Sequence, residues 1–298
     1  MIFFNKVSEL KYLPLNYRWR LFIFHVKRAL TIPFSPELYE INYFLNSHLI
    51  RYNGFLKLVR SNSYITHFKN FKNTNDKDII LTLRKLPSSD FKVFEQIMVK
   101  EEYKPLIDLL NDNFCLNEPL LVLDAGGNIG AFSVYLNAFC PNASFVIIEP
   151  DDGNCSILSE NVSQNGLKVI SLVKAGLWNS NTYLELFSDF RDNMEWSYRV
   201  KEVRYKTNLK AYSLESIMNI ACVSSIDILK LDIEGAEAQI FSDFCSITKC
   251  LKKVRFIAIE IHDEFNCRTN ITNILSRSGF RLISHNETLF GFNEQFVN

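Results

Sequence analysis

The sequence predicts an α/β protein in which a mostly parallel sheet is covered by helices on both faces. From residue 120 onward, short apolar runs that end in acids or glycines alternate with segments of helical spacing. Near the end of the chain, the strand-like runs GFRLISH and TLFGFNEQF meet at His285-Asn286-Glu287, which predicts a terminal hairpin and one antiparallel strand. The five apolar runs are LLVLD, SFVIIE, VISLVKAG, IDILKLD and VRFIAIE.

The chain divides into three predicted segments. Residues 1–78 form an accessory region, mainly helical, which ends in the polar stretch FKNTNDKD. Residues 79–118 lead into the sheet, because DIILTLRKL alternates like a strand and SSDFKVFEQIM begins with a helix cap and continues with helical spacing. Residues 119–298 contain the sheet itself.

An insertion at residues 181–211 separates the third and fourth apolar runs. Its segments TYLELF and VRYKTNLKAY are typical of paired strands, and the polar loop SDFRDNMEWS lies between them. The insertion could form a lid that stacks on a sugar ring, or it could be an exposed hairpin. The side chains that a lid would use are Arg191, Trp196, Tyr198 and Arg199.

Composition limits the classes of function. The chain has 298 residues, 47% of them hydrophobic, and its 33 basic residues balance 33 acidic ones. A general attraction for nucleic acid is therefore not expected. The seven cysteines are an odd number without CxxC spacing, which argues against a disulfide framework or a structural zinc site and favours the cytoplasm.

The basic amino-terminal region carries the one local charge excess. Tyr17 to Leu30, YRWRLFIFHVKRAL, mixes aromatic residues with cations. This pattern suits either an interfacial helix beside anionic lipid or a helix that caps the core and exposes its cations. No apolar run approaches the ~20 residues that cross a bilayer, so any membrane contact is expected to be peripheral.

A glycine turn follows the first apolar run and predicts the ligand. Its residues read D-x-G-x-N-x-G rather than the G-x-G-x-x-G of a dinucleotide site, which disfavours a nicotinamide-dependent oxidoreductase. An acid at the turn would repel a pyrophosphate but suits S-adenosyl-L-methionine, which has an ammonium, a sulfonium and a ribose but no phosphate. The predicted cofactor-binding residues here are Asp124, Gly126, Gly127, Asn128 and Gly130.

Glu149 is the second part of the predicted cofactor site. It ends the apolar run SFVIIE, where a carboxylate can accept hydrogen bonds from both ribose hydroxyls of an adenosine. Nicotinamide-dependent enzymes also bind ribose through a carboxylate at this position. The alternative to a ribose-binding role is that Glu149 is a solvated carboxylate at a strand end.

Four ionisable residues follow the fourth and fifth runs. KLDIEGAE places Asp232 and Glu234 at one strand end, and IEIH places Glu260 and His262 at the next. Period-two alternation puts each pair on one face. His262 is predicted as the general base, because its ordinary pKa lies near neutral pH, with Asp232 or Glu234 orienting it or the substrate hydroxyl.

A divalent metal is an alternative use of the carboxylates. Asp232, Glu234 and Glu260 are oxygen ligands that suit Mg²⁺, which could lower the pKa of a vicinal diol. Carboxylate clusters also serve a cofactor's ammonium and structural ion pairs, so no residue is assigned as a metal ligand.

Together these motifs resemble the FkbM family of S-adenosylmethionine-dependent methyltransferases. The matching stretches are SDFKVFEQIMVKEEY, LDAGGNIGAFS, VIIEP, KLDIEGAEAQIF and IEIH, which span about Asp90 to His262. Gly127 departs from the alanine that the family more often has, and the region before about Thr82 is not covered.

The resemblance implies a class I Rossmann-like fold and O-methylation of a small natural product, or of a sugar in a glycan or glycolipid. No Asn-Pro-Pro-aromatic motif follows the fourth run, so an oxygen acceptor is expected rather than a nitrogen acceptor. The alternatives are a methyltransferase with a nitrogen acceptor and a protein that binds the cofactor without catalysis.

Overall fold

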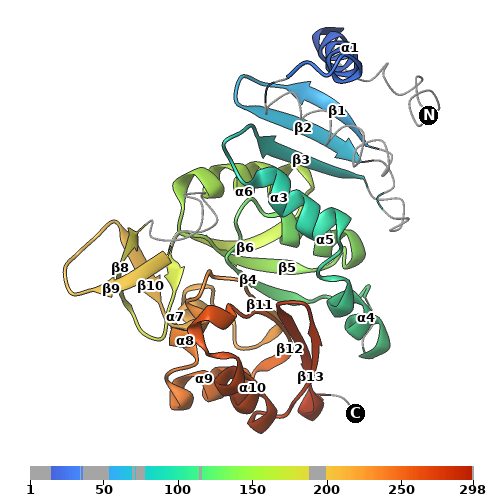
Figure 1. Cartoon of the computed structure of the whole chain (residues 1–298). Helices are drawn as coiled ribbons and strands as arrows, with labels where there is room; N and C mark the ends of the chain where they lie inside the picture. Colours follow the sequence, from blue (N-terminus) through green and yellow to red (C-terminus); the bar gives the residue numbers. More distant parts are fainter. Residues whose placement is uncertain are drawn as a thin grey trace. The chain divides into compact units, whose positions relative to one another are not determined.

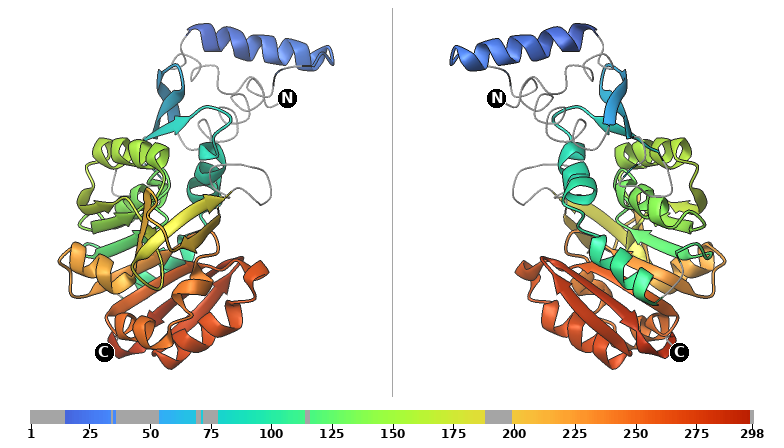
Figure 2. Two further views of the ribbon diagram at one scale, coloured as in Figure 1. Left: turned by 90° about the vertical axis from the view of Figure 1, so that its left-hand side faces the viewer. Right: turned by 90° about the vertical axis from the view of Figure 1, so that its right-hand side faces the viewer.

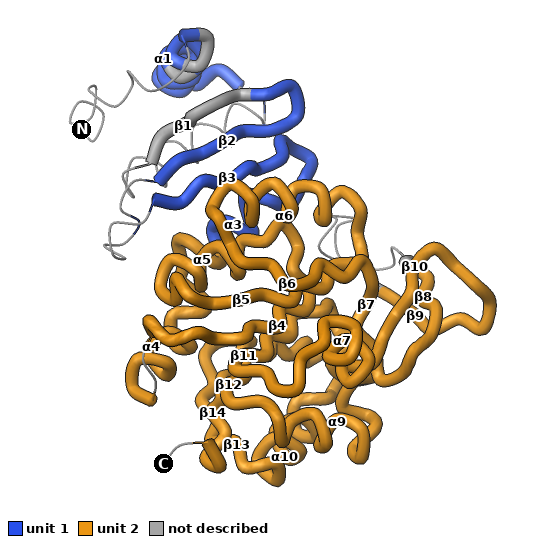
Figure 3. The backbone as a smooth tube through the Cα atoms, turned by 180° about the vertical axis from the view of Figure 1, so that it is seen from behind, with its two compact units in different colours: residues 1–95 blue, residues 96–298 orange. Residues whose placement is uncertain are grey.

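The computed structural model describes residues 15–33, 35, 54–68, 71, 78–113, 116–187 and 199–296. Its backbone divides into two units, residues 1–95 and residues 96–298 (Figure 3). The division lies within the segment 79–118 that the sequence grouped as one, because the strand of that segment pairs in the first unit and its later helix packs in the second.

The described part of the first unit contains two helices and a small antiparallel sheet (Figure 1). Its sheet has the order β1-β2-β3, and Arg84 at the end of β3 pairs with the buried Asp90 of α3 at 2.7 Å. The sequence predicts a mainly helical region before residue 79, and the described part of that region has the helix α1 together with the strands β1 and β2, which the sequence pattern does not predict. The elements are α1 (Leu15–Ala29), β1 (Gly54–Val59), β2 (Ser63–Phe68), β3 (Ile79–Arg84) and α3 (Asp90–Phe94).

The second unit is built on a seven-stranded sheet of order β13-β14-β12-β11-β4-β5-β6. All neighbouring pairs from β12 to β6 are parallel, whereas β14 runs antiparallel to both β12 and β13, as the sequence predicts. The strands are β4 (Leu121–Ala125), β5 (Ser144–Ile148), β6 (Lys168–Val173), β11 (Ile226–Leu231), β12 (Val254–Glu260), β13 (Phe280–His285) and β14 (Thr288–Asn293).

Helices cover both faces of this sheet (Figures 1 and 2). On one face, alternate strand residues such as Leu123, Leu229 and Ile257 form a continuous apolar core with α7, α9 and α10. Residues between them, such as Val122 and Phe145, are equally buried and point to the other face. The helices are α4 (Lys104–Asn113), α5 (Ala131–Phe139), α6 (Asp152–Gln164), α7 (Leu214–Ile220), α8 (Glu237–Ile240), α9 (Phe244–Leu251) and α10 (Arg268–Arg277), with the shorter turns η4 (Glu95–Val99), η5 (Asp263–Phe265) and η6 (Glu294–Phe296).

The insertion forms a second sheet of order β7-β10-β8-β9. β8 pairs antiparallel with both β9 and β10, which confirms the predicted paired strands. The intervening loop, residues 188–198, lies outside the described residues, so the predicted lid remains a prediction. The strands are β7 (Gly176–Leu177), β8 (Thr182–Phe187), β9 (Arg199–Val203) and β10 (Leu209–Tyr212).

The strand order fixes where a ligand can bind. Chain order reverses between β4 and β11, since successive strands extend from β4 to β6 on one side and from β11 outward on the other. In open α/β sheets, ligands bind at the carboxyl ends of the strands beside such a switch point.

Candidate functional site

The glycine turn after β4 lies directly against the end of β5. The N–H groups of Gly126 and Gly127 both donate to the carbonyl of Ile148, at 3.0 and 2.9 Å. Gly126 adopts φ +79°, and a Cβ there would collide with the carbonyl oxygen of Asp232. Only glycine therefore allows β4 and β11 to end this close together.

Glu149 fixes the position of this turn from β5. Its buried carboxylate accepts hydrogen bonds from the N–H of Asn128 at 2.7 Å and the N–H of Asp151 at 2.9 Å. The side-chain amide of Asn154 donates a third hydrogen bond at 3.2 Å. Burial raises the pKa of Glu149, and these hydrogen bonds oppose the rise.

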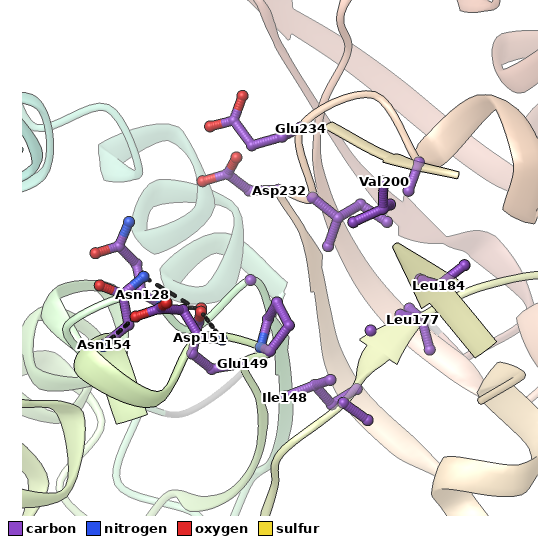
Figure 4. A pocket seen from close by; sticks show the side chains of 16 residues that line it. Asn128, Ile148, Glu149, Asp151, Asn154, Leu177, Leu184, Val200, Asp232 and Glu234 are labelled. Carbon is purple, nitrogen blue, oxygen red and sulfur yellow. Dashed lines mark hydrogen bonds between the residues drawn. The ribbon is translucent and has the colours of Figure 1, made fainter. Parts of the chain in front are cut away.

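A pocket opens beside this carboxylate at the switch point (Figure 4). It encloses about 820 Å³ when the part open to solvent is included. One side is apolar and is formed by Leu177 of β7 together with Leu184 and Val200 of the insertion. Its described lining carries four carboxylates and no lysine or arginine; the carboxylates are Glu149, Asp151, Asp232 and Glu234.

Asp232 and Glu234 lie across the pocket from Glu149 and its hydrogen-bond partners (Figure 4). Both follow β11, in a turn where Glu234 has φ +55° and Gly235 has φ +94°. A non-glycine residue in this left-handed region carries a conformational cost, and such residues concentrate at functional sites.

The buried Lys230 connects β11 to the glycine turn. Its Nζ lies 3.2 Å from Asp124 and 3.5 Å from Asp232, and it donates to the carbonyl of Gly126 at 2.7 Å. Burial alone would lower the pKa of Lys230, but the charges of Asp124 and Asp232 outweigh this effect and raise it. Lys230 is therefore a permanent cation behind the pocket.

His262 lies between two carboxylates beyond the end of β12. Its Nε2 is 3.4 Å from Glu234 and its Nδ1 is 3.4 Å from the buried Glu237. Burial would lower the pKa of His262, but hydrogen bonding and charge from both glutamates raise it to about 11. At neutral pH the side chain is an imidazolium, which disfavours the predicted role of His262 as proton acceptor.

Glu260, which is partly buried at the end of β12, has other acidic groups around it. The charge of Asp232, burial and the charge of Glu102 raise its pKa to about 10. Glu102 is itself buried and accepts a hydrogen bond from Thr288 at 2.7 Å. At neutral pH Glu260 therefore carries a proton in the ligand-free protein.

The structure gives no support to the magnesium alternative. Among the described residues, no group of three or more histidine, cysteine, aspartate or glutamate side chains is arranged to hold a metal ion. The carboxylates of the pocket instead pair with Lys230 or His262, or accept hydrogen bonds from backbone amides.

Half of the predicted site residues lie on the pocket wall. These are Gly126, Asn128, Glu149, Asp232 and Glu234.

The other predicted residues lie behind that wall. Asp124 is fully buried and accepts a hydrogen bond from Ser133 at 2.7 Å, and Gly130 is the N-cap of α5 with φ +79°. Gly127, Glu260 and His262 also lie outside the lining. Their roles toward a ligand stay predictions, and any such role would act through neighbouring residues.

Sequence reasoning missed Lys230, Asn154 and Glu237. One usable signal was present, because Lys230 stands two residues before Asp232 in a strand and must share its face. Asn154 and Glu237 offered no comparable signal, since both act from helices whose placement depends on tertiary packing.

Comparisons with known proteins identify the family of the chain. The model of the methyltransferase FkbM domain matches residues 124–282, more than half of the chain. AMB antimetabolite synthetase AmbE of Pseudomonas aeruginosa is 26% identical over 66% of the chain, which spans only 11% of that protein. Methyltransferase 1 of Beauveria bassiana is 20% identical over 51% of the chain and 72% of its own length.

A crystal structure of methyltransferase FkbM from Methylobacillus flagellatus KT is also similar. The aligned region covers 58% of this chain and 43% of the other chain, with 17% sequence identity and a TM-score of 0.39. The matched family domain begins at Asp124 in the glycine turn motif and ends at residue 282, within β13. With the sheet order of class I Rossmann-like methyltransferases and a family domain that fills most of its second unit, the chain belongs to the FkbM methyltransferase family.

Proposed function

We propose that the chain transfers the methyl group of S-adenosyl-L-methionine to a hydroxyl group of an acceptor. The observation that carries this proposal is the charge of the pocket, whose described lining has four carboxylates and no lysine or arginine. A phosphate-bearing cofactor would be repelled there, whereas a sulfonium and an ammonium would be attracted.

Glu149 would bind the ribose of the cofactor. Its carboxylate is buried, lines the pocket and is held by the N–H groups of Asn128 and Asp151. A carboxylate in a fixed position can accept hydrogen bonds from vicinal hydroxyls without first reorganising. Asp232, across the pocket from Glu149, would face the positively charged methionine part of the cofactor.

Glu234 would receive the proton of the acceptor hydroxyl. In this step the acceptor oxygen forms a bond to the methyl carbon, the bond from that carbon to sulfur breaks, and S-adenosylhomocysteine leaves. Glu234 lines the pocket, while His262, at 3.4 Å, orients it as an imidazolium. His262 is thus a positioning residue in this proposal, and most of the rate would come from aligning two bound reactants.

The acceptor would be a small natural product or a sugar unit of a glycan or glycolipid, in the cytoplasm. The apolar wall from β7, β8 and β9 supports an acceptor with an apolar face, such as the C–H face of a sugar ring, since it lies on the opposite side of the pocket from the acids. The absence of a CxxC pair or an even set of cysteines supports the location.

The test is methyl transfer from methyl-labelled cofactor to a panel of sugars, glycolipids, hydroxylated small molecules and amines. We expect label in an oxygen-linked methyl group, with one equivalent of S-adenosylhomocysteine released. Label found only on amines would replace the proposal with a nitrogen acceptor. Tight cofactor binding without transfer to any acceptor of the panel would favour a protein that binds the cofactor without catalysis.

A further inference from the structure

α1 exposes an apolar stripe that no other described helix matches. Leu15, Trp19, Phe22, Ile23 and Val26 follow the spacing of one helical face, and Leu30 extends it past the end of the helix. Their side chains remain 39–71% exposed, with Trp19 at 61% and Phe22 at 59%. The rings of Trp19 and Phe22 contact each other edge to face, with centroids 5.6 Å apart. The exposed surface is therefore continuous and partly aromatic.

The opposite face of α1 carries a buried residue. Phe24, about 150° from the centre of the stripe at about 100° per residue, is only 2% exposed. A helix that caps a core turns its apolar side inward and its charges outward. α1 buries Phe24 and leaves a separate apolar face outside, which removes the core-capping alternative for that face.

Cations border the stripe on both sides. At about 100° per residue, Arg18 lies beside one edge of it, and Arg20 and Lys27 lie beside the other. Residues 15–33 include no aspartate or glutamate, and Arg28 adds a fourth cation in the last turn. The charged side chains of α1 itself are thus all basic.

We propose that α1 docks through this stripe on the surface of an anionic lipid bilayer. Exposed aromatic and aliphatic side chains enter the boundary between headgroups and acyl chains, and flanking arginine and lysine bind the anionic headgroups. A second copy of the chain would instead bring the two sets of cations together. α1 lies in the plane of the membrane, and in the part of the chain that the structure describes no helix is long and apolar enough to cross it.

This inference is independent of methyl transfer, since it involves neither the cofactor pocket nor an acceptor. Attraction between α1 and the surface grows with the anionic fraction of the bilayer and weakens as salt screens the charges. Binding therefore depends on both apolar insertion and charge, and each can be removed separately.

The test is sedimentation of the full chain with vesicles of phosphatidylcholine, with and without phosphatidylserine. We expect binding to the anionic vesicles and at least about tenfold less in Trp19→Ser/Phe22→Ser, because two large side chains no longer insert. The matched control is Ile220→Ser/Phe244→Ser, which removes apolar side chains of 48% and 46% exposure from the second unit and should bind normally.

Charge is tested in the same way. Arg20→Gln/Lys27→Gln, which removes the two cations beside one edge of the stripe, should bind the anionic vesicles several-fold more weakly, while the exposed pair Lys252→Gln/Lys253→Gln should behave as wild type. Quenching of Trp19 fluorescence by brominated lipid needs no disruptive variant, and the signal lost in Trp19→Phe identifies its source among the three tryptophans.

Three results would overturn the inference. Wild-type protein that does not sediment with anionic vesicles would exclude bilayer docking. Binding that both α1 variants leave unchanged would place the contact elsewhere. Self-association without lipid, abolished by Trp19→Ser/Phe22→Ser, would assign the stripe to a second copy of the chain.

Discussion

At the scale of single residues, Gly127 occupies the position where the family more often has alanine. Its backbone would accept alanine, but a Cβ would collide with Ile147 Cγ2 and lie 2.8 Å from Leu158 Cδ1. We expect Gly127→Ala to lower the free energy of unfolding by about 1–3 kcal/mol, as overpacking does.

Urea denaturation of a double-mutant cycle tests this cause. Ile147→Ala alone should destabilise the protein by leaving a cavity, yet in the Gly127→Ala background its cost should be smaller by about 0.5 kcal/mol or more. Strictly additive changes would show that the side chain of Ile147 is not what excludes alanine.

Turnover measurements distinguish whether Glu234 or His262 accepts the proton of the acceptor. If Glu234 accepts the proton, Glu234→Gln should lower kcat by about 10²-fold or more, because an amide is not a base. His262→Gln should lower kcat less and shift its pH profile, since the glutamate loses its cationic neighbour at 3.4 Å. The measurement is kcat against pH with the acceptor identified by the label transfer. A larger loss in His262→Gln than in Glu234→Gln would return the base role to the histidine.

At the scale of elements, Lys230 holds β11 and β4 together at the pocket. Lys230→Met would leave Asp124 and Asp232 without their cation, and we expect a loss of about 3–5 kcal/mol in the free energy of unfolding. Adding Asp124→Asn should recover part of this loss. The control Lys252→Met removes an exposed lysine and should change stability by less than about 0.5 kcal/mol. A Lys230→Met variant as stable as this control would contradict the buried ion pair.

Two titratable residues at the end of β12, Glu260 and His262, predict how the stability of the fold depends on pH. The folded pKa of His262 is about 11 against an ordinary 6.5, and that of Glu260 is about 10 against 4.5. Both are raised, so the folded state binds more protons, and its stability falls as pH rises through the interval between the two values of each group. Urea unfolding at several values between pH 6 and 9 should show this fall, with a shallower slope in His262→Gln. An unchanged slope in that variant would show that His262 titrates normally.

At the scale of the whole molecule, local pattern predicts the strands and the edge where they end. Apolar runs ending in acids suffice for that, because a parallel sheet buries both faces of each strand. Pairings between distant segments depend on register instead. Lys230 meets Asp124 because these residues are Cα partners in the β11 and β4 register, which neither segment specifies alone.

The amino-terminal sheet is a second feature that the sequence pattern alone does not predict. Residues 54–68 lack a regular alternation of apolar and polar side chains, and their strands form by antiparallel pairing with each other and with β3. Glu237 likewise reaches His262 only because the left-handed turn at Glu234 and Gly235 redirects the chain. Such contacts follow from tertiary structure rather than from periodicity.

Calorimetric titration with S-adenosyl-L-methionine tests the central claim most directly, using wild type, Glu149→Gln and the exposed control Glu215→Gln. We predict micromolar affinity, about −8 kcal/mol, for wild type and control. Glu149→Gln should bind at least about tenfold more weakly, since hydrogen bonds to a charged group contribute about 1.5–3 kcal/mol. Equal affinity in all three proteins, or no binding by folded wild type, would contradict the assignment of this pocket to the cofactor.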